Sequence, residues 1–305
     1  MTPSINPNSE IFLGNLQQIQ NRISTAERQL SSGLRVAVAS DDPDEISSIL
    51  QLRAQIAGVQ QTQENLSNVT PQVESGENAI QQAIQVLDTA TSLATEASGS
   101  TSNATQRQDE IPQVQGILEQ LVSLSQTAVS GQYIFSGDLS GQPQYTLAAN
   151  GDSVQQMTQP GPPGQILDAN GLPISIGLTA QQIFDDQDAN GNPTAANVFA
   201  AVTGFLSALQ NNDSAGIQAA VTNIQTASAH LNDESSFYGA AQNNLTAASS
   251  SAGQTLIQLQ QQLSNEQDAD VAQSALDLNT ATTDEQAAMS AQAMLKPQSL
   301  FNYLG

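Results

Sequence analysis

The 305-residue sequence contains no cysteine and no tryptophan, and aromatic residues make up only 4% of it. Without cysteine there are no disulfides, no thiol catalysis and no thiolate metal sites. A core with so few rings favours helices packed along their length over an enclosed enzyme pocket. No apolar run is long enough to span a bilayer, and the first residues are polar, unlike a cleaved signal peptide. If the protein is exported, we expect a route that needs no such signal.

Basic residues are also scarce. The chain has 6 lysines and arginines against 29 acidic residues, giving a formal net charge of −23. The six are Arg22, Arg28, Arg35, Arg53, Arg107 and Lys296. The long span between the last two contains none. Because so acidic a chain repels phosphate backbones and anionic lipid, we expect neither nucleic-acid nor membrane binding.

Catalytic motifs are missing as well. The one histidine, His230, falls in a helical pattern and has no second imidazole to join it. The sequence has no phosphate-binding loop, no dinucleotide fingerprint and no serine nucleophile elbow. We therefore predict no catalytic residue, no cofactor and no enzymatic activity.

One stretch, "DQDANGNPTAAN", resembles part of a calcium loop. Asp186, Asp188 and Asn190 match its first half, but Asn197 stands where the loop needs a bidentate glutamate. A similar "LDANG" occurs at Leu167–Gly171. Asn-Gly is also the commonest hairpin-turn pair. The favoured interpretation is a plain turn without metal, and weak calcium binding is the alternative.

The N-terminal third of the chain carries two apolar stripes with helical spacing, and a long helix near the C-terminus carries another at Leu245, Ala248, Ala252, Leu256, Leu259 and Leu263. The first has steps of three and four, and the second recurs at strict seven-residue intervals, which is the seam of a helix packed on another helix. Pro71 falls within the second stripe and is expected to bend or break that helix. The first stripe is Leu16, Ile19, Ile23, Ala26 and Leu30; the second is Leu52, Val59, Leu66, Val73, Ile80 and Leu87.

The middle of the chain has a different texture. Residues 136–197 are rich in Gly, Pro, Asn and Asp with short alternating runs, which predicts β-hairpins, and helical periodicity resumes at Val198. The expected fold is mainly α with a β-rich insert, in which both chain ends form a long antiparallel, coiled-coil-like rod. The predicted domains are terminal helices at 1–40 and 270–305, a helical rod at 41–135 and 198–269, and the insert at 136–197.

The connector "LSSGLRVAVASDDPDE" joins two of these predicted helices. Gly33 is a plausible helix stop. Asp42, Pro43 and Glu45 match an N-cap, a first-turn proline and a capping-box glutamate. A helix N-terminus favours ionised carboxylates, so Asp41 and Asp42 are expected to act structurally rather than as general acids.

Four stretches together resemble one family. "ERQLSSGLRVAVASDDPDE" and the helix after it resemble the N-terminal region shared by flagellin and hook-associated protein 3. "SGQYIFSGD" resembles the passage from its helical part into the middle domain. "SSFYGAAQNNL" and "SLFNYL" resemble the entry into the C-terminal helix and its end. The resemblance covers residues 1–138 and 198–305, and the insert has no signature.

The resemblance implies a subunit of the bacterial flagellar axial structure, extracellular and exported through the type III pathway. It also implies that the chain ends pair in an inner coiled-coil core while the insert faces outward. The implied partners are further copies of the chain, hook-associated protein 1, flagellin and an export chaperone. The predicted assembly seam is Leu16, Ile19, Ile23, Leu30, Leu295, Leu300, Phe301, Tyr303 and Leu304.

Two branches of the family remain open. Asp41-Asp42-Pro43, "YIFSG" and the Asn-Tyr-Leu ending resemble the hook-filament junction branch, whereas "SINPNSEIFLGNLQ" resembles a flagellin start. The junction role is favoured and the filament subunit is the alternative. An intracellular coiled-coil scaffold would not explain the Gly-rich insert, and a calcium-binding adhesin would need more acidic loops.

Overall fold

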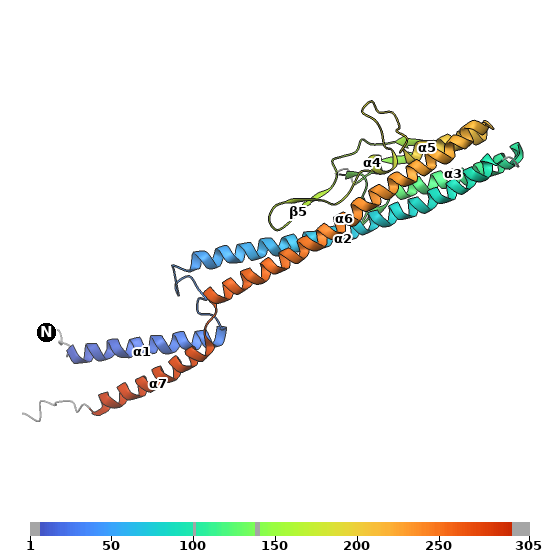
Figure 1. Ribbon diagram of the computed structural model, residues 1–305. Coiled ribbons are helices and arrows are strands. Elements are labelled where there is room, and N and C mark those ends of the chain that lie inside the picture. The colour runs from blue at the N-terminus through green and yellow to red at the C-terminus, as the bar shows by residue number, and fades with distance from the viewer. Residues whose placement is uncertain (1–6, 100–101, 138–140, 295–305) are drawn as a thin grey trace, which may run out of the picture. The chain divides into compact units, whose positions relative to one another are not determined.

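The computed structural model describes residues 7–99, 102–137 and 141–294 (Figure 1). The chain divides into two compact units. Unit 1 consists of residues 1–57 and 256–305, and unit 2 consists of residues 58–255. The division falls inside two long helices, away from the predicted domain boundaries near residues 40 and 270.

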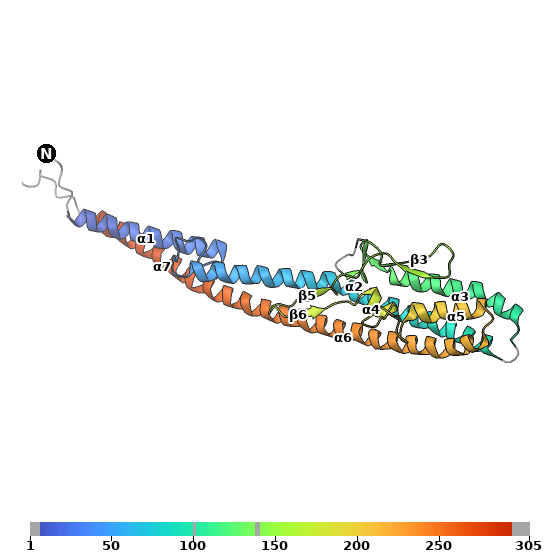
Figure 2. The ribbon, with the colours of Figure 1, turned by 90° about the horizontal axis from the view of Figure 1, so that it is seen from above.

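Unit 1 contains a pair of antiparallel helices from the two ends of the chain, α1 (Pro7–Ser32) and α7 (Val271–Met294). They lie side by side in Figures 1 and 2. Arg22 pairs with Asp284 at 3.2 Å, and the Ser274 hydroxyl donates to the Gln29 side chain at 3.1 Å. Low residue numbers on one helix thus face high numbers on the other, as an antiparallel pair requires.

Unit 2 is built mainly from α2 (Ile46–Ser98) and α6 (Ser214–Gln267), which also run antiparallel. The Gln242 amide donates to the Glu77 carboxylate across the pair. The predicted stripe with seven-residue spacing is buried at all six of its positions: Leu52, Val59, Leu66, Val73, Ile80 and Leu87. Helix α2 runs through Pro71 without a break. The expected break is therefore wrong, because the buried stripe continues on both sides of this exposed proline.

Two shorter helices complete the bundle of unit 2, α3 (Ala104–Ser125) and α5 (Val198–Gln210). They lie alongside α2 and α6 in Figure 2. Asn103 starts α3 with a capping box to Gln106, and Asn197 caps α5 by accepting the Ala200 N–H at 2.8 Å. Asn197, the residue that weakened the calcium-loop match, therefore serves a helix.

The described residues contain three two-stranded antiparallel sheets, one just before the insert and two within it. The strand pairs are β1 (Ala128–Val129) with β2 (Gln132–Tyr133), β3 (Tyr145–Leu147) with β4 (Val154–Gln156), and β5 (Gln165–Leu167) with β6 (Pro173–Ser175). One short helix, α4 (Ala180–Phe184), follows. The predicted fold class, mainly α with a β-rich insert between antiparallel end helices, is confirmed.

Six of the eleven aromatic residues gather where the insert meets the helices of unit 2. Phe135 packs edge-on against Phe184 and Tyr238, with ring centroids 6.0 and 6.4 Å apart. Phe199 stacks on Phe184 at 5.7 Å. The Tyr238 hydroxyl accepts the Leu178 N–H at 3.1 Å, and burial raises its pKa above the ordinary value. The cluster consists of Phe135, Tyr145, Phe184, Phe199, Phe237 and Tyr238.

A buried carboxylate in α3 gives a test of stability against pH. Glu110 is only 6% exposed, and its Oε2 has no partner among the described residues. Burial raises the pKa of Glu110, and the negative charge of Glu96 adds to the effect. The folded state thus favours the protonated form. Stability falls as pH rises from the ordinary pKa through the raised folded value, and the full cost is present above it.

Replacing Glu110 by glutamine should therefore raise the free energy of unfolding by about 1 kcal/mol at neutral pH. The gain should vanish below the ordinary glutamate pKa, where Glu110 is protonated in both states. Urea unfolding at the two pH values measures it. Glu119→Gln, at an exposed position of the same helix, is the control. An equal gain at both pH values would show that the charge is not the cause.

Candidate assembly site

The connector between α1 and α2, residues 33–45, starts with the predicted helix stop. Helix α1 ends at Ser32, and Gly33 has φ +71°. Its N–H donates to the Gln29 carbonyl at 2.8 Å, which satisfies an orphan carbonyl of the last turn. Only glycine adopts this conformation without strain.

The connector pairs with the short link between α6 and α7. Leu34 and Asp268 form an antiparallel bridge. The Arg35 N–H donates to the Gln267 carbonyl at 2.7 Å, and the Ala269 N–H donates to the Gly33 carbonyl at 2.9 Å. The two points at which the chain passes into and out of the terminal helices are therefore hydrogen-bonded to each other.

Arg35 adds side-chain contacts to this junction. Its guanidinium lies 3.1 Å from Asp42 Oδ2, pairs with the Glu45 carboxylate, and donates to the Glu266 carbonyl. The hydrogen bond to Glu45 is the largest cause of a raised Arg35 pKa, which burial opposes. One cation thus joins three points: the connector, the start of α2 and the end of α6.

This arrangement corrects one prediction. Helix α2 begins at Ile46, and Glu45 does not act as a capping-box residue, because its carboxylate is drawn to Arg35. Asp42 Oδ1 does accept the Glu45 N–H, at 3.4 Å, across Pro43. Sequence reasoning missed the role of Arg35. The available signal was a single cation placed just before a cluster of four acids.

Asp41 closes the connector itself. Its Oδ2 accepts the N–H groups of Ala37 and Val38, both at 3.0 Å. These two hydrogen bonds lower the Asp41 pKa, and Arg28, 3.6 Å away, contributes further. Asp41 is therefore held ionised, which agrees with a structural role and argues against a general acid.

Replacing Arg35 by glutamine should lower the free energy of unfolding of unit 1 by about 1–2 kcal/mol, since two half-exposed ion pairs and one hydrogen bond are lost. Trypsin can measure this, because it cleaves at Arg22 and Arg28 within α1. We expect cleavage there to accelerate about tenfold. Arg53→Gln is the matched control, since Arg53 is exposed and makes no ion pair among the described residues. Equal effects of the two changes would contradict the role given to Arg35.

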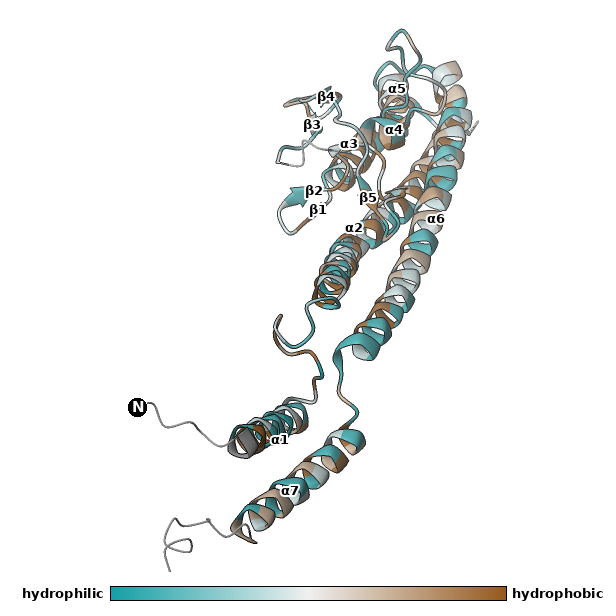
Figure 3. Cartoon of the chain, turned by 90° about the vertical axis from the view of Figure 1, so that its left-hand side faces the viewer, coloured by the Kyte–Doolittle hydropathy of each residue, from teal (hydrophilic) through white to brown (hydrophobic). Residues whose placement is uncertain are grey.

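The predicted seam is only partly covered within the terminal pair, α1 and α7. Ala26 and Ala281 are buried in it. Leu16, Ile19, Ile23 and Leu30 are half-buried, whereas Leu295, Leu300, Phe301, Tyr303 and Leu304 lie outside the described residues. Several large apolar side chains of the pair are more than half exposed: Ile11, Leu13, Val271, Leu276, Met289 and Met294. Teal and brown residues alternate along α7 in Figure 3. The pair leaves apolar surface available for another helix.

The calcium-loop candidate forms a hairpin turn. Asp188 Oδ1 accepts the N–H groups of Asn190 and Asn192 at 2.8 and 2.9 Å, and Asp186 accepts the Thr194 hydroxyl. The carboxylates are thus engaged by the turn itself. Within residues 7–99, 102–137 and 141–294, no group of three or more acidic or histidine side chains could hold a metal ion.

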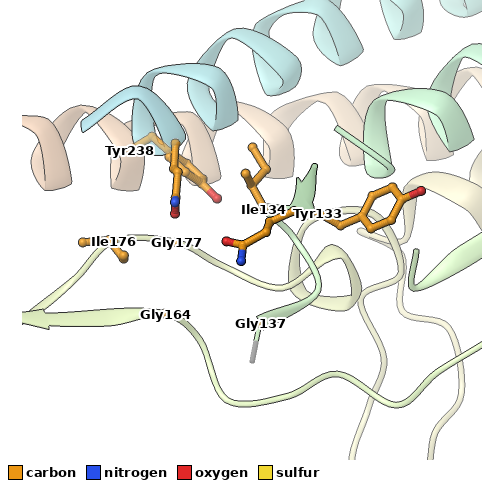
Figure 4. Close-up of a pocket in the computed structure, with 9 residues that line it drawn as sticks. Tyr133, Ile134, Gly137, Gly164, Ile176, Gly177 and Tyr238 are labelled. Carbon is orange, nitrogen blue, oxygen red and sulfur yellow. The ribbon is translucent and has the colours of Figure 1, made fainter. Parts of the chain in front are cut away.

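A groove of about 250 Å³ lies between the insert and the helices of unit 2. In Figure 4, Tyr238 and Ile134 lie on its helix side, and Gly164 and Gly177 come from the insert. Its lining contains no charged residue. His230 Nε2 is hydrogen-bonded to the Gln182 carbonyl at 2.9 Å, which links α6 to α4. His230 Nδ1 lies 3.8 Å from Glu234 Oε1 on the same helix. None of the described helices is long and apolar enough to cross a membrane.

The two ends of the chain form an antiparallel helix pair, and a further domain is inserted between them. This arrangement defines a class of helical subunits whose termini pair with each other. Comparison with known proteins then gives the family. Residues 4–139 match the bacterial flagellin N-terminal helical region, and residues 221–304 match the bacterial flagellin C-terminal helical region. Together the two matches cover well over half of the chain and meet in the terminal pair. The chain belongs to the flagellin family.

Individual relatives agree with this. Flagellin B of Helicobacter pylori is 29% identical over 143 residues, which is 46% of this chain and 28% of Flagellin B. The chain therefore spans less than a third of the length of this relative. The structure of a flagellar hook-associated protein from Vibrio parahaemolyticus matches with a TM-score of 0.64 at 17% identity, over 75% of this chain and 100% of that chain. Flagellar hook associated protein-3 of Legionella pneumophila matches with a TM-score of 0.60 at 14% identity, over 71% and 98%. These two likenesses concern the fold.

Proposed function

We propose that this chain is a structural subunit of the bacterial flagellar axial structure, and specifically its hook-filament junction protein. The observation that carries the proposal is the terminal pair: the two ends of the chain lie antiparallel and leave large apolar side chains exposed. A helix pair of this kind is stabilised when further helices cover its open stripe. Self-assembly through α1 and α7 supplies those helices.

The junction role is preferred over the filament role for two reasons. The chain covers nearly all of two hook-associated proteins of the same fold but only 28% of Flagellin B. Asp41-Asp42-Pro43 and "YIFSG" also resemble the junction branch. The alternative is the filament subunit, which the sequence match to Flagellin B favours.

The proposed role implies particular partners and a location outside the cell. The chain would contact further copies of itself and the neighbouring axial proteins, hook-associated protein 1 and flagellin, outside the cell. An export chaperone would keep its terminal helices apart before assembly, and export would need no cleaved signal. In this role the chain is not an enzyme and takes no cofactor.

Deletion of the gene followed by electron microscopy tests the proposal. Cells without a junction protein should keep their hooks, lose their filaments and release flagellin monomer into the medium. Normal filaments after deletion would refute a flagellar role. Loss of filaments with no other monomer in the medium would indicate the filament subunit instead.

Abundance separates the same two roles without genetics. A junction protein should be a minor band in sheared filaments, whereas a filament subunit should account for most of their mass. A dominant band would overturn the junction assignment while leaving the family unchanged.

A further inference from the structure

The insert contains a short repeat that neither the calcium-loop interpretation nor the assembly role explains. The tripeptide Ala-Asn-Gly occurs three times, ending at Gly151, Gly171 and Gly191, each twenty residues after the last. All three glycines have positive φ, 75°, 80° and 81°. In each turn the glycine N–H donates to the carbonyl three residues earlier, at 2.9 to 3.0 Å. The three turns therefore share sequence and backbone, and their asparagines, at positions 150, 170 and 190, are exposed.

Two of the turns are clamped by a carboxylate. Asp168 Oδ1 accepts the N–H groups of Asn170 and Leu172, both at 2.8 Å. Asp188 does the same for Asn190 and Asn192. These backbone hydrogen bonds are the leading cause of a lowered pKa at both aspartates, so each carries a full negative charge at neutral pH.

The first turn lacks this clamp. Ala148 stands where the other turns have aspartate. Asn150 Oδ1 accepts only the Asp152 N–H, at 3.3 Å. The nearest side-chain atom to the face of Gly151 is the Gln115 amide nitrogen, 3.9 Å from where a Cβ would stand. That nitrogen donates to Asp152 Oδ1 at 2.8 Å. In the first turn the neighbouring carboxylate is therefore bound to Gln115, whereas in the other two turns a carboxylate accepts the backbone N–H groups of the turn itself.

We propose that Asn150-Gly151 is a site of spontaneous deamidation, and that Asp168 and Asp188 protect the two sister turns. The Gly151 nitrogen loses its proton and attacks Cγ of Asn150. A C–N bond forms, the bond from Cγ to Nδ2 breaks, and Nδ2 leaves as ammonia with the proton it gains. Water then opens the five-membered imide to aspartate or isoaspartate.

The three turns differ in how strongly their hydrogen bonds oppose the attack of the glycine nitrogen. Attack needs the asparagine to leave its turn conformation. In the second and third turns this requires two backbone hydrogen bonds to Asp168 or Asp188 to open. Deamidation adds one carboxylate to the insert, so the modified fraction at Asn150 should increase with the age of the protein. This inference is independent of the proposed assembly role.

The rates can be compared within one molecule. The full-length protein is incubated in mildly alkaline buffer and digested with a protease that cleaves before aspartate. Peptides 138–151, 168–184 and 188–212 each carry one of the three sites. Mass spectrometry measures the gain of about one dalton at each asparagine. We expect Asn150 to deamidate about tenfold faster than Asn170 and Asn190. Equal rates, or a faster rate at either of the other two, would overturn the proposal.

Reciprocal variants test the cause. Asp168→Ala should raise the rate at Asn170 about tenfold, and Ala148→Asp should lower the rate at Asn150 by a similar factor. In strong denaturant the three rates should converge, because the hydrogen bonds of the turns are lost and all three sites share Ala-Asn-Gly. If the difference persisted in denaturant, or if both variants left the rates unchanged while circular dichroism showed a folded chain, the protection by Asp168 and Asp188 would be wrong.

Discussion

Alanine in place of Gly76 should destabilise unit 2 by about 2 kcal/mol, although alanine normally favours a helix interior. The reason is the packing of Tyr238 from α6 against this point of α2. A Cβ on Gly76 would clash with Cε1 of the Tyr238 ring and stand 3.0 Å from its Cζ, and that ring is only 1% exposed and hydrogen-bonded to Leu178. The ring cannot move aside without disturbing the aromatic cluster.

Gly58 in the same helix provides the control. Nothing lies within 4 Å of a Cβ built there, and the residue is exposed. Gly58→Ala should therefore stabilise by about 0.5–1 kcal/mol through helix propensity alone. Opposite signs in urea unfolding are the expected result. If both glycines responded alike, the close approach of Tyr238 would not be the determinant.

A double-mutant cycle isolates the contact. Tyr238→Ala should cost about 3–5 kcal/mol by itself, since it removes a buried ring. In that background Gly76→Ala should no longer destabilise, because the ring it would meet is gone. Strict additivity of the two changes would contradict the argument.

The helices were predictable because their signal is periodic and local. A stripe with a period of seven can be buried only on a helix, and every position from Leu52 to Leu87 in it is buried. The contact between Phe135 and Tyr238 was not predictable, although both residues lie in stretches that carry the family resemblance. They are about a hundred residues apart, and no sequence period connects them.

In the connector, too, local features could be predicted from the sequence whereas contacts with distant residues could not. Gly33 was identified as a helix stop because positive φ is a local property of glycine. The predicted capping role of Glu45 is wrong because its carboxylate pairs with the guanidinium of Arg35 instead of with the backbone at the helix start. The spacing of Ile19 and Ile23 alone assigns them to one face of α1, and the assembly role of that face stays a prediction. How far that face would stay uncovered depends on α7, which the stripe does not specify.

A carboxylate at position 281 should abolish assembly while leaving unit 2 folded. Ala281 in α7 is fully buried, as is nearly all of Ala26 in α1, so the terminal pair has no room and no water for a charge there. An unpaired buried carboxylate costs several kcal/mol, on the order of 3 or more. The pair depends on packing for its helical structure, because most helical stability in proteins comes from tertiary packing rather than from propensity. Ala281→Asp should therefore separate α1 from α7.

The positions of the basic residues make this separation measurable. Arg22 and Arg28 lie in α1, and Arg107 is the only tryptic site in residues 58–255. In the Ala281→Asp protein, cleavage at Arg22 and Arg28 should accelerate more than tenfold. Cleavage at Arg107 should not change, because its guanidinium is held by the Ala97 carbonyl and the Asn212 side chain within unit 2.

Ala287→Asp is the matched variant, with the same charge on the same helix at an exposed position. It should retain normal protection at Arg22 and support filament formation when it replaces the deleted gene, whereas Ala281→Asp should support none. If Ala281→Asp assembled normally, pairing of the chain ends would not be required for function. If Ala287→Asp also failed while α1 stayed protected, the exposed face of α7 would itself be the surface that the neighbouring subunit covers.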